Sequence, residues 1–368
     1  MIVGVPKEIK NKENRVGMVV AGVRALTNAG HKVMVQHNAG IGVGISNDDY
    51  RKAGALIAET AKEVYEKSDM IVKVKEPLPE EYSLLREGQI LYTYLHLAAD
   101  ERLTKALMER KIVGIAYETI QPADGSLPLL APMSAVAGRM ATQIGATYLQ
   151  HDHGGKGMLL GGVPGVERAH VVVLGGGVVG VNAAKMAIGL GAKVTILDTN
   201  MHRLDYLADI FGNDVTTLYS NSEQIERSVT SADLVIGAVL VPGAKAPKLV
   251  NRDMLSKMQP GGVIIDVAVD QGGSVETCRP TSHEHPTYTV DGIIHYAVPN
   301  MPGAVPRTST YALTNVTLKY ALQIANLGWH DAVARDEALR KGVNICNGKL
   351  TYKQVADDLG LPFDTLKI

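Results

Sequence analysis

The chain has 368 residues, 46% of them hydrophobic and 20% charged, which is the composition of a folded protein with room for two domains. Lysine and arginine number 37 against 38 aspartates and glutamates, and this balance argues against nucleic acid or an anionic membrane as a partner. No stretch of about 18 residues is both apolar and uncharged, so we expect no membrane span.

Lys7, Glu8 and Lys10 place charge where a signal peptide would be apolar, so a cytoplasmic protein is expected.

The first third of the chain has the alternation of strands and helices that is typical of a parallel sheet. Apolar runs without a polar face predict strands that are buried on both sides. We expect strands over residues 2–5, 32–36, 70–74, 89–95 and 113–120, and helices over 22–29, 59–68 and 100–111.

A second series follows a long, nearly uncharged stretch that predicts a buried connecting helix over residues 131–150. Both series have the βαβ order of a doubly wound α/β fold, so we expect two such units with parallel sheets. Periodicity leaves open whether the C-terminal segment rejoins the first unit. The later elements are strands over 170–174, 193–198, 215–220, 234–239 and 263–269, helices over 178–190, 201–211 and 308–327, and two short helices around Asn347-Gly348 within 331–359.

The most specific motif is a glycine-rich turn between a predicted strand and a predicted helix. Residues 175–180 read GGGVVG and fit the G-x-G-x-x-G pattern of dinucleotide sites. Gly175 permits the tight turn, Gly177 lets backbone N–H groups approach a pyrophosphate, and Gly180 permits close packing of the helix on the strand. The sequence therefore predicts a dinucleotide site at this turn.

The strand after this motif ends at Asp198, about 20 residues on, where a carboxylate can bind the ribose hydroxyls of NAD. Because a carboxylate repels the 2′-phosphate of NADP, NAD is the expected cofactor. Arg203 opposes this choice, since a nearby arginine can accommodate that phosphate. The structural alternative for Asp198 is a cap for the helix that begins near Met201.

Candidates for the chemistry follow predicted strands, where the active sites of doubly wound sheets lie. Lys75, His96 and Asp270 each come directly after an apolar run. Histidine titrates near neutral pH and suits proton transfer. Arg15, in a polar loop after the first strand, can clamp a carboxylate with two parallel hydrogen bonds. These four residues are the predicted substrate site.

Each candidate also has a structural alternative. His96 would be a core or helix-capping histidine, and Lys75 an ordinary surface lysine. Asp270 would cap a turn at Gly272-Gly273, and Arg15 would be a solvated charge in a charged loop.

We expect no metal and no disulfide framework. The run His151-Asp152-His153 looks like a metal cluster, but alternate residues point apart and no further ligand spacing supports it. Cys278 and Cys346 have no metal or redox spacing.

Six strings together resemble the bacterial L-alanine dehydrogenases over essentially the whole chain: VGVPKEIKNKENRV, KVKEP, LYTYLHLA, LGGGVVG, IIDVAVDQGG and VPNMPGAVPRTST. The resemblance implies two Rossmann-like domains with an active-site cleft between them, and commonly a homohexamer. It places the substrate domain at residues 1–130 with 308–368, and the NAD-binding domain at 131–307. It implies reversible NAD-dependent deamination of L-alanine to pyruvate and ammonia.

The resemblance also implies residue roles. Arg15 and Lys75 would bind the substrate carboxylate, with Lys75 also on the carbonyl oxygen. His96 would be the acid/base, and Asp270 would serve ammonia or water at the same carbon. The NAD site is implied at Ser134, Gly175, Gly177, Val178, Val179, Gly180, Asp198, Arg203, Ser220, Val239, Leu240, Val267, Ala268, Val269, Asp270, Val298, Pro299, Asn300 and Met301.

Two other functions compete with this one. The NAD-binding subunit of a proton-pumping transhydrogenase shares the fold and part of the motif set, and would pass hydride to a second nucleotide. A catalytically idle NAD-binding module would bind NADH without turning over alanine. The joint presence of the four substrate-site candidates favours the amino-acid enzyme.

Overall fold

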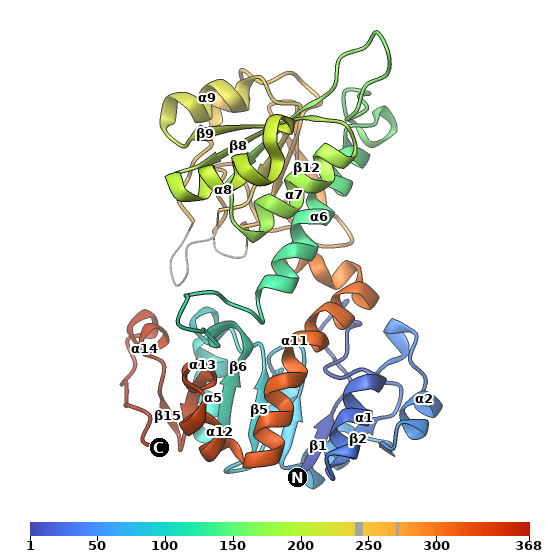
Figure 1. The fold of residues 1–368 in the computed structure, drawn as a ribbon, viewed down its shortest axis with the longest axis vertical. Coiled ribbons are helices and arrows are strands. Elements are labelled where there is room, and N and C mark those ends of the chain that lie inside the picture. The colour runs from blue at the N-terminus through green and yellow to red at the C-terminus, as the bar shows by residue number, and fades with distance from the viewer. Residues whose placement is uncertain (240–245, 270–271) are drawn as a thin grey trace. The chain divides into compact units, whose positions relative to one another are not determined.

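The computed structural model describes residues 1–239, 246–269 and 272–368, and these divide into two compact units. Unit 1 is Met1–Met133 with Val305–Ile368, and unit 2 is Ser134–Ala304. Each unit contains one sheet flanked by helices (Figure 1), so the predicted α/β class is confirmed. No helix in the described part of the chain is long and apolar enough to cross a membrane.

The sheet of unit 1 has eight strands in the order β15-β14-β6-β5-β4-β1-β2-β3. Strands β1 to β6 run parallel, and β14 and β15 are antiparallel to their neighbours. The strands are β1 (Ile2–Val5), β2 (Lys32–Gln36), β3 (Leu56–Ala58), β4 (Met70–Val72), β5 (Ile90–Thr93), β6 (Val113–Ala116), β14 (Val343–Cys346) and β15 (Lys349–Leu350).

Helices cover this sheet, and their caps follow from local sequence. Asp100 begins α5 (Glu101–Glu109), and its side chain accepts the N–H of Leu103 at 3.0 Å. The long helix α11 (Pro306–Leu327) begins at a proline and packs beside α1 (Val20–Asn28) (Figure 1). The others are α2 (Asn47–Lys52), α3 (Ala61–Lys67), α4 (Pro79–Tyr82), α12 (Trp329–Arg335), α13 (Glu337–Gly342) and α14 (Lys353–Leu359).

The C-terminal segment differs from its prediction of two short helices. It contains three helices and a hairpin, in which β14 pairs antiparallel with β6 and so joins the sheet of unit 1. Asn347 and Gly348 both have positive φ, of 51° and 76°, which suits the tight turn between β14 and β15. These strands are too short for their periodicity to be read from sequence.

Several strands also end before the predicted residue. β4 ends at Val72 and β5 at Thr93, although the apolar runs continue to Val74 and Leu95. The N–H of Val74 donates to Glu8 Oε1 at 2.6 Å, and that of Leu95 donates to Glu118 Oε1 at 3.1 Å. Glutamate side chains thus take backbone N–H groups just beyond these strands.

Unit 2 has a seven-stranded sheet in the order β12-β13-β11-β10-β7-β8-β9, parallel except for the edge strand β12. Its strands are β7 (His170–Leu174), β8 (Lys193–Asp198), β9 (Val215–Tyr219), β10 (Leu234–Gly237), β11 (Val263–Asp266), β12 (Thr287–Val290) and β13 (Ile293–Tyr296). Its helices are α7 (Val178–Gly189), α8 (Met201–Phe211), α9 (Ser222–Thr230) and α10 (Arg252–Leu255); the connecting helix α6 (Ala131–Tyr148) runs into it from unit 1.

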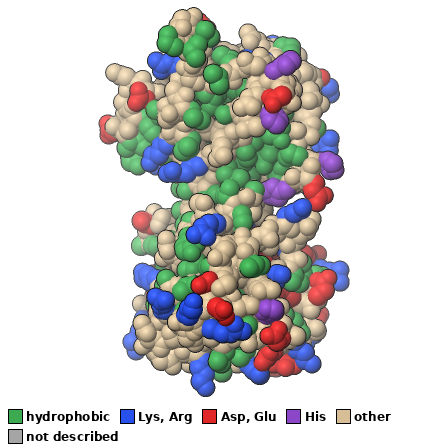
Figure 2. All heavy atoms as spheres, turned by 90° about the vertical axis from the view of Figure 1, so that its right-hand side faces the viewer, with side chains coloured by type: hydrophobic (Ala, Val, Ile, Leu, Met, Phe, Trp, Pro, Cys, Tyr) green, Lys and Arg blue, Asp and Glu red, His purple; other side chains and the backbone are tan. Residues whose placement is uncertain are grey.

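Each unit has its own apolar core around central strands, with Ile71 and Leu91 in unit 1 and Val172 and Ile264 in unit 2 among the fully buried side chains. On the face shown in Figure 2, positive and negative side chains are interspersed, in keeping with the net charge of -1.

The close packing of α7 on β7 yields a stability prediction. A Cβ at Gly180 would lie 1.9 Å from the carbonyl oxygen of Gly175, so the backbone must move to accept it. We expect Gly180→Ala to lower the free energy of unfolding by about 1–3 kcal/mol, measured by urea denaturation. Gly189→Ala in the same helix is the control, because a Cβ there has nothing within 4 Å. It should be neutral or stabilising, and equal losses in the two variants would contradict the packing argument.

Candidate active site

The predicted substrate residues of unit 1 follow the carboxyl ends of parallel strands. Arg15 lies in the loop after β1, Lys75 follows β4, and His96 follows β5. Because β1, β4 and β5 are neighbours in the sheet, these three residues lie along one edge. Asp270, the fourth candidate, lies outside the described residues.

Arg15 is a buried residue with a buried counter-ion. Its side chain is 2% exposed, and that of Glu13 is 0% exposed. The guanidinium binds the carboxylate through two contacts, Nε to Oε1 at 2.7 Å and Nη2 to Oε2 at 2.5 Å. Nη1 reaches Met133 Sδ, a weak acceptor, at 3.2 Å. The alternative of a solvated arginine is therefore wrong, and the Glu13 partner was missed at the sequence level.

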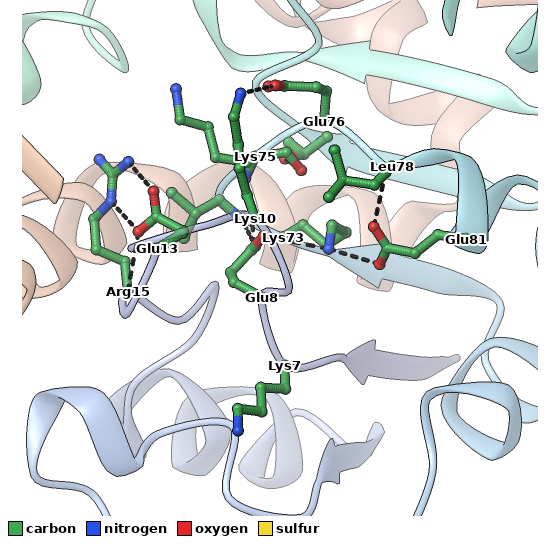
Figure 3. A network of polar contacts seen from close by, with 12 residues as sticks. Lys7, Glu8, Lys10, Glu13, Arg15, Lys73, Lys75, Glu76, Leu78 and Glu81 are labelled. Carbon is green, nitrogen blue, oxygen red and sulfur yellow. Dashed lines mark hydrogen bonds and ion pairs between the residues drawn. The ribbon is translucent and has the colours of Figure 1, made fainter. Parts of the chain in front are cut away.

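Lys75 differs from its neighbours because its amine has no hydrogen bond or ion pair with any described residue. Figure 3 shows the amine extending from the strand end with no dashed line to it, whereas Lys10 and Lys73 each contact a glutamate. Burial lowers the pKa of Lys75, and the neighbouring charge of Arg15 lowers it further, against the opposing effect of Glu76. The amine is thus a desolvated cation whose protonated form would be stabilised by an anion.

The backbone that carries Lys75 is held by a buried ionic network (Figure 3). Glu8 Oε1 accepts the N–H groups of Val74 at 2.6 Å and Lys75 at 3.3 Å. The amine of Lys73 lies 3.3 Å from Glu8 Oε2 and 2.8 Å from Glu81 Oε1. Burial raises the pKa of Glu8, and the charge of Lys73 opposes this rise. This network fixes the strand end beneath Lys75.

His96 is oriented by carboxylates on both its ring and its backbone. Nδ1 lies 3.1 Å from Glu76 Oε2, and the backbone N–H donates to Glu118 Oε1 at 2.7 Å. The φ of His96 is 49°, in the left-handed region that a histidine seldom adopts. Its side chain is 41% exposed and makes no cap bond to the 3₁₀ turn that follows, so it is neither a core nor a capping histidine.

Glu76 contacts two basic groups. Its Oε1 pairs with Lys10 while its Oε2 faces His96. Burial raises the pKa of Glu76, but the hydrogen bond and charge of His96, the charge of Lys75 and the Lys10 hydrogen bond outweigh this and hold it well below its usual range. Glu76 is therefore an ionised carboxylate near neutral pH.

In unit 2, the glycine-rich turn has the geometry of a phosphate cradle. Gly175 has a φ of 99°, and a Cβ on it would meet the carbonyl oxygen of Ala238 at 2.9 Å. A Cβ on Gly177 would meet nothing within 4 Å, so this side of the turn is open. Gly177 is also the N-cap of α7, and no side chain caps that helix. The first N–H groups of α7 are thus available to an anion, and the turn fits a dinucleotide.

Asp198 and Arg203 both bind the glycine turn. The N–H of Gly176 donates to Asp198 Oδ2 at 2.7 Å, and Arg203 Nε donates to the carbonyl oxygen of Gly176 at 2.5 Å. The cap of α8 is Asn200, whose side chain accepts the N–H of Arg203, so Asp198 is not the helix cap. The Asp198 carboxylate accepts two backbone N–H groups, those of Gly176 and Asn200. A carboxylate has about four acceptor positions, so Asp198 retains capacity for ribose hydroxyls.

The other predicted NAD-site residues of unit 2 also lie mostly beyond strand ends of its sheet. Ser220 follows β9, Val239 follows β10, and Val267, Ala268 and Val269 follow β11, while Leu240 lies outside the described residues. Val298, Pro299, Asn300 and Met301 come after β13, and Ser134 lies on α6. Among the described residues, no three histidine, cysteine, aspartate or glutamate side chains group closely enough to hold a metal ion.

Comparison with known proteins assigns both halves of the chain to one family. Residues 4–137 match the family description "Alanine dehydrogenase/PNT, N-terminal domain", and residues 141–353 match "Alanine dehydrogenase/PNT, C-terminal domain". The chain is 63% identical to an alanine dehydrogenase of Methanococcus maripaludis over 99% of this chain and 98% of that relative. It is 57% identical to an alanine dehydrogenase of Bacillus subtilis over 99% and 96%.

Solved structures of an alanine dehydrogenase and of a transhydrogenase both superpose on this chain. An L-alanine dehydrogenase superposes with a TM-score of 0.95 at 54% identity, covering 98% of this chain and 99% of that one. A transhydrogenase from Sinorhizobium meliloti superposes with a TM-score of 0.82 at 25% identity, covering 95% and 100%. The chain is thus more similar to the alanine dehydrogenases than to this transhydrogenase.

The buried pair of Arg15 and Glu13 predicts a large loss of stability when one charge is removed. Glu13→Gln keeps the shape of the side chain but removes the carboxylate that contacts the buried guanidinium at two atoms. We expect the free energy of unfolding, from urea denaturation at neutral pH, to fall by about 3–5 kcal/mol. Glu63→Gln, in the exposed pair with Lys67, is the matched control and should change it little. A small effect of Glu13→Gln would show that Arg15 is not held as described.

Removing Lys75, whose amine pairs with no described residue, should change the free energy of unfolding in the opposite direction. Because its folded-state pKa is lowered, the charged form is disfavoured in the native protein, and removing it should stabilise the fold. We expect Lys75→Met to raise the free energy of unfolding by about 1 kcal/mol without ligand, near neutral pH. Lys62→Met, at an exposed lysine, should not do so. A loss of stability in Lys75→Met would mean that this amine has a structural partner.

Proposed function

The chain belongs to the alanine dehydrogenase/PNT family, and from this premise we propose that it catalyses the reversible oxidative deamination of L-alanine to pyruvate and ammonia, with NAD as the hydride acceptor. The observation that carries the proposal beyond family membership is the amine of Lys75, which pairs with no described residue and lies at the same sheet edge as Arg15 and His96. A sheet edge with one cation that no described carboxylate pairs with fits a substrate with one carboxylate.

Arg15 and Lys75 divide the binding of the carboxylate between them. Glu13 already neutralises Arg15, so this guanidinium supplies direction through its Nη1 edge, where the weak acceptor Met133 Sδ can be displaced. Lys75 supplies a cation that pairs with no described residue. Burial lowers the pKa of its amine, and a bound anion would raise that pKa again. The amine also polarises the carbonyl oxygen of pyruvate in the reverse direction.

His96 handles the proton. Glu76 can only accept a hydrogen bond, so Nδ1 of His96 carries the proton that it donates, and Nε2 is the atom available to substrate. In deamination Nε2 removes a proton as water adds to the carbon that has lost hydride, and in amination it returns one. For Asp270 we propose the role that the resemblance implies, serving water or ammonia at the same carbon.

NAD, when bound, supplies the nicotinamide that takes up or releases hydride. We propose that the first N–H groups of α7 bind its pyrophosphate and that Asp198 binds a ribose hydroxyl. The carboxylate disfavours the 2′-phosphate of NADP, and Arg203 is already engaged with Gly176 and stacked on Tyr206. We further propose, on family membership, that the chain acts as a homohexamer.

The proposed function predicts NADH formation from L-alanine in preference to larger amino acids, followed by absorbance with NAD in excess. His96→Ala should lower this rate by about 10²–10⁴-fold, the usual contribution of a general acid/base, and should change NADH affinity, measured by fluorescence, only a few-fold. Absence of alanine turnover in a folded protein that binds NADH would favour the idle module. Hydride exchange between two nucleotides without alanine turnover would favour the transhydrogenase.

A further inference from the structure

Glu76 is an acidic side chain in contact with His96, the proton-transfer group of the proposed reaction, and the two residues come from adjacent strand ends. Glu76 follows β4 and His96 follows β5, which is the neighbouring strand. Glu76 Oε2 lies 3.1 Å from Nδ1, and the glutamate side chain is 14% exposed. Lys10, from the loop after β1, holds the other carboxylate oxygen. Glu76 is thus fixed at both of its oxygens.

The backbone of His96 is fixed independently of its ring. Glu118, in the 3₁₀ turn after β6, accepts the N–H groups of Leu95 and His96 at 3.1 and 2.7 Å. These bonds hold the left-handed conformation of His96, which leaves its side chain a limited range of directions. The ring stacks on Tyr94 with centroids 5.6 Å apart. Glu118 and Tyr94 therefore place the ring, and Glu76 selects which nitrogen faces it.

The charges around the ring identify Glu76 as the group that acts on its protonation. Tyr94 is neutral, because burial raises the pKa of its hydroxyl far above the ordinary value. Glu118 accepts the backbone N–H of His96, and Asp100 accepts the N–H of Leu103 at the start of α5, so both of these carboxylates bind backbone groups. Lys10 pairs with Glu76, and the charge of Lys75 also acts on this carboxylate. A carboxylate in contact with an imidazole favours the imidazolium.

We propose that Glu76 is a positioning residue for the reaction proposed above: it keeps the proton of His96 on Nδ1, directs Nε2 to the substrate, and stabilises the protonated ring through the charge of its carboxylate. The substrate carboxylate is bound by other residues, so loss of Glu76 affects proton transfer more than alanine binding. The assignment rests on the proposed function for its role in turnover, but the coupling of the two side chains does not depend on it.

The test follows His96 directly as well as through activity. Diethyl pyrocarbonate modifies only the unprotonated imidazole, so its rate at His96 against pH, read by mass spectrometry of the digested full-length protein, gives the protonation midpoint. In Glu76→Gln we expect this midpoint to fall by about one pH unit, the lower end for a contacting charge because the ring is partly exposed. Glu80→Gln, at an exposed position on α4, is the matched control and should leave it unchanged.

The pH dependence of turnover should shift in the same direction as the midpoint of His96 modification. In Glu76→Gln the acidic limb of kcat/KM for deamination should move to lower pH by the same amount, and kcat should fall about 10-fold, part of the usual contribution of a general base, with KM for alanine nearly unchanged. Glu76→Asp keeps the charge but shortens the side chain, so it should retain the midpoint and lose kcat. Simple structural damage would lower activity without moving the midpoint or the limb.

The outcomes separate the two proposals. A midpoint that is the same in Glu76→Gln and the unaltered protein overturns the assignment of Glu76. If Glu76→Gln does not fold, a lowered midpoint in Glu76→Asp overturns it equally. An unaltered protein that shows the expected chemical titration but no turnover of alanine supports the coupling and refutes the proposed function.

Discussion

Glutamate side chains neutralise the cations around Lys75 and leave its own amine without a partner in the described part of the chain. Glu13 pairs with Arg15, Glu76 with Lys10, and Glu8 and Glu81 with Lys73. Because these pairs are formed within the protein, Lys75 is the cation of this group that has no ion pair with a described residue, and the proposed substrate carboxylate would bind there. The proposed binding of a small carboxylate depends on this incomplete pairing, since a lysine that is already paired with a glutamate would attract it less.

The same carboxylates shape the backbone at the strand ends. Glu8 receives the N–H groups that follow β4, and Glu118 receives those that follow β5. Side-chain acceptors thus fix the residues that carry Lys75 and His96, including a left-handed histidine that costs conformational energy. A desolvated lysine and a strained histidine at one edge are destabilising features, and both are retained where the proposed chemistry needs them.

The sequence predicted what is local in the chain and missed what depends on strand order. The glycine turn and Asp198 could be read from sequence because strand, turn, helix and strand follow one another without interruption. Glu76 and Glu118 lie 20 and 22 residues from His96, and only the adjacency of β4, β5 and β6 brings them together. Glu13 is two residues from Arg15, so its pairing could have been proposed from the loop sequence. The strands β14 and β15 were missed because four and two residues show no periodicity.

The most direct test of the central claim, that Lys75 supplies the cation that pairs with the substrate carboxylate, is a crystal structure with NADH and pyruvate in the absence of ammonium, so that no turnover occurs. The account predicts a pyruvate carboxylate within hydrogen-bond distance of Lys75 Nζ and Arg15 Nη1, with Met133 Sδ displaced from the guanidinium and His96 Nε2 facing the carbonyl oxygen. A pyruvate bound with its carboxylate away from Lys75, while that amine still lacks a partner, would contradict it.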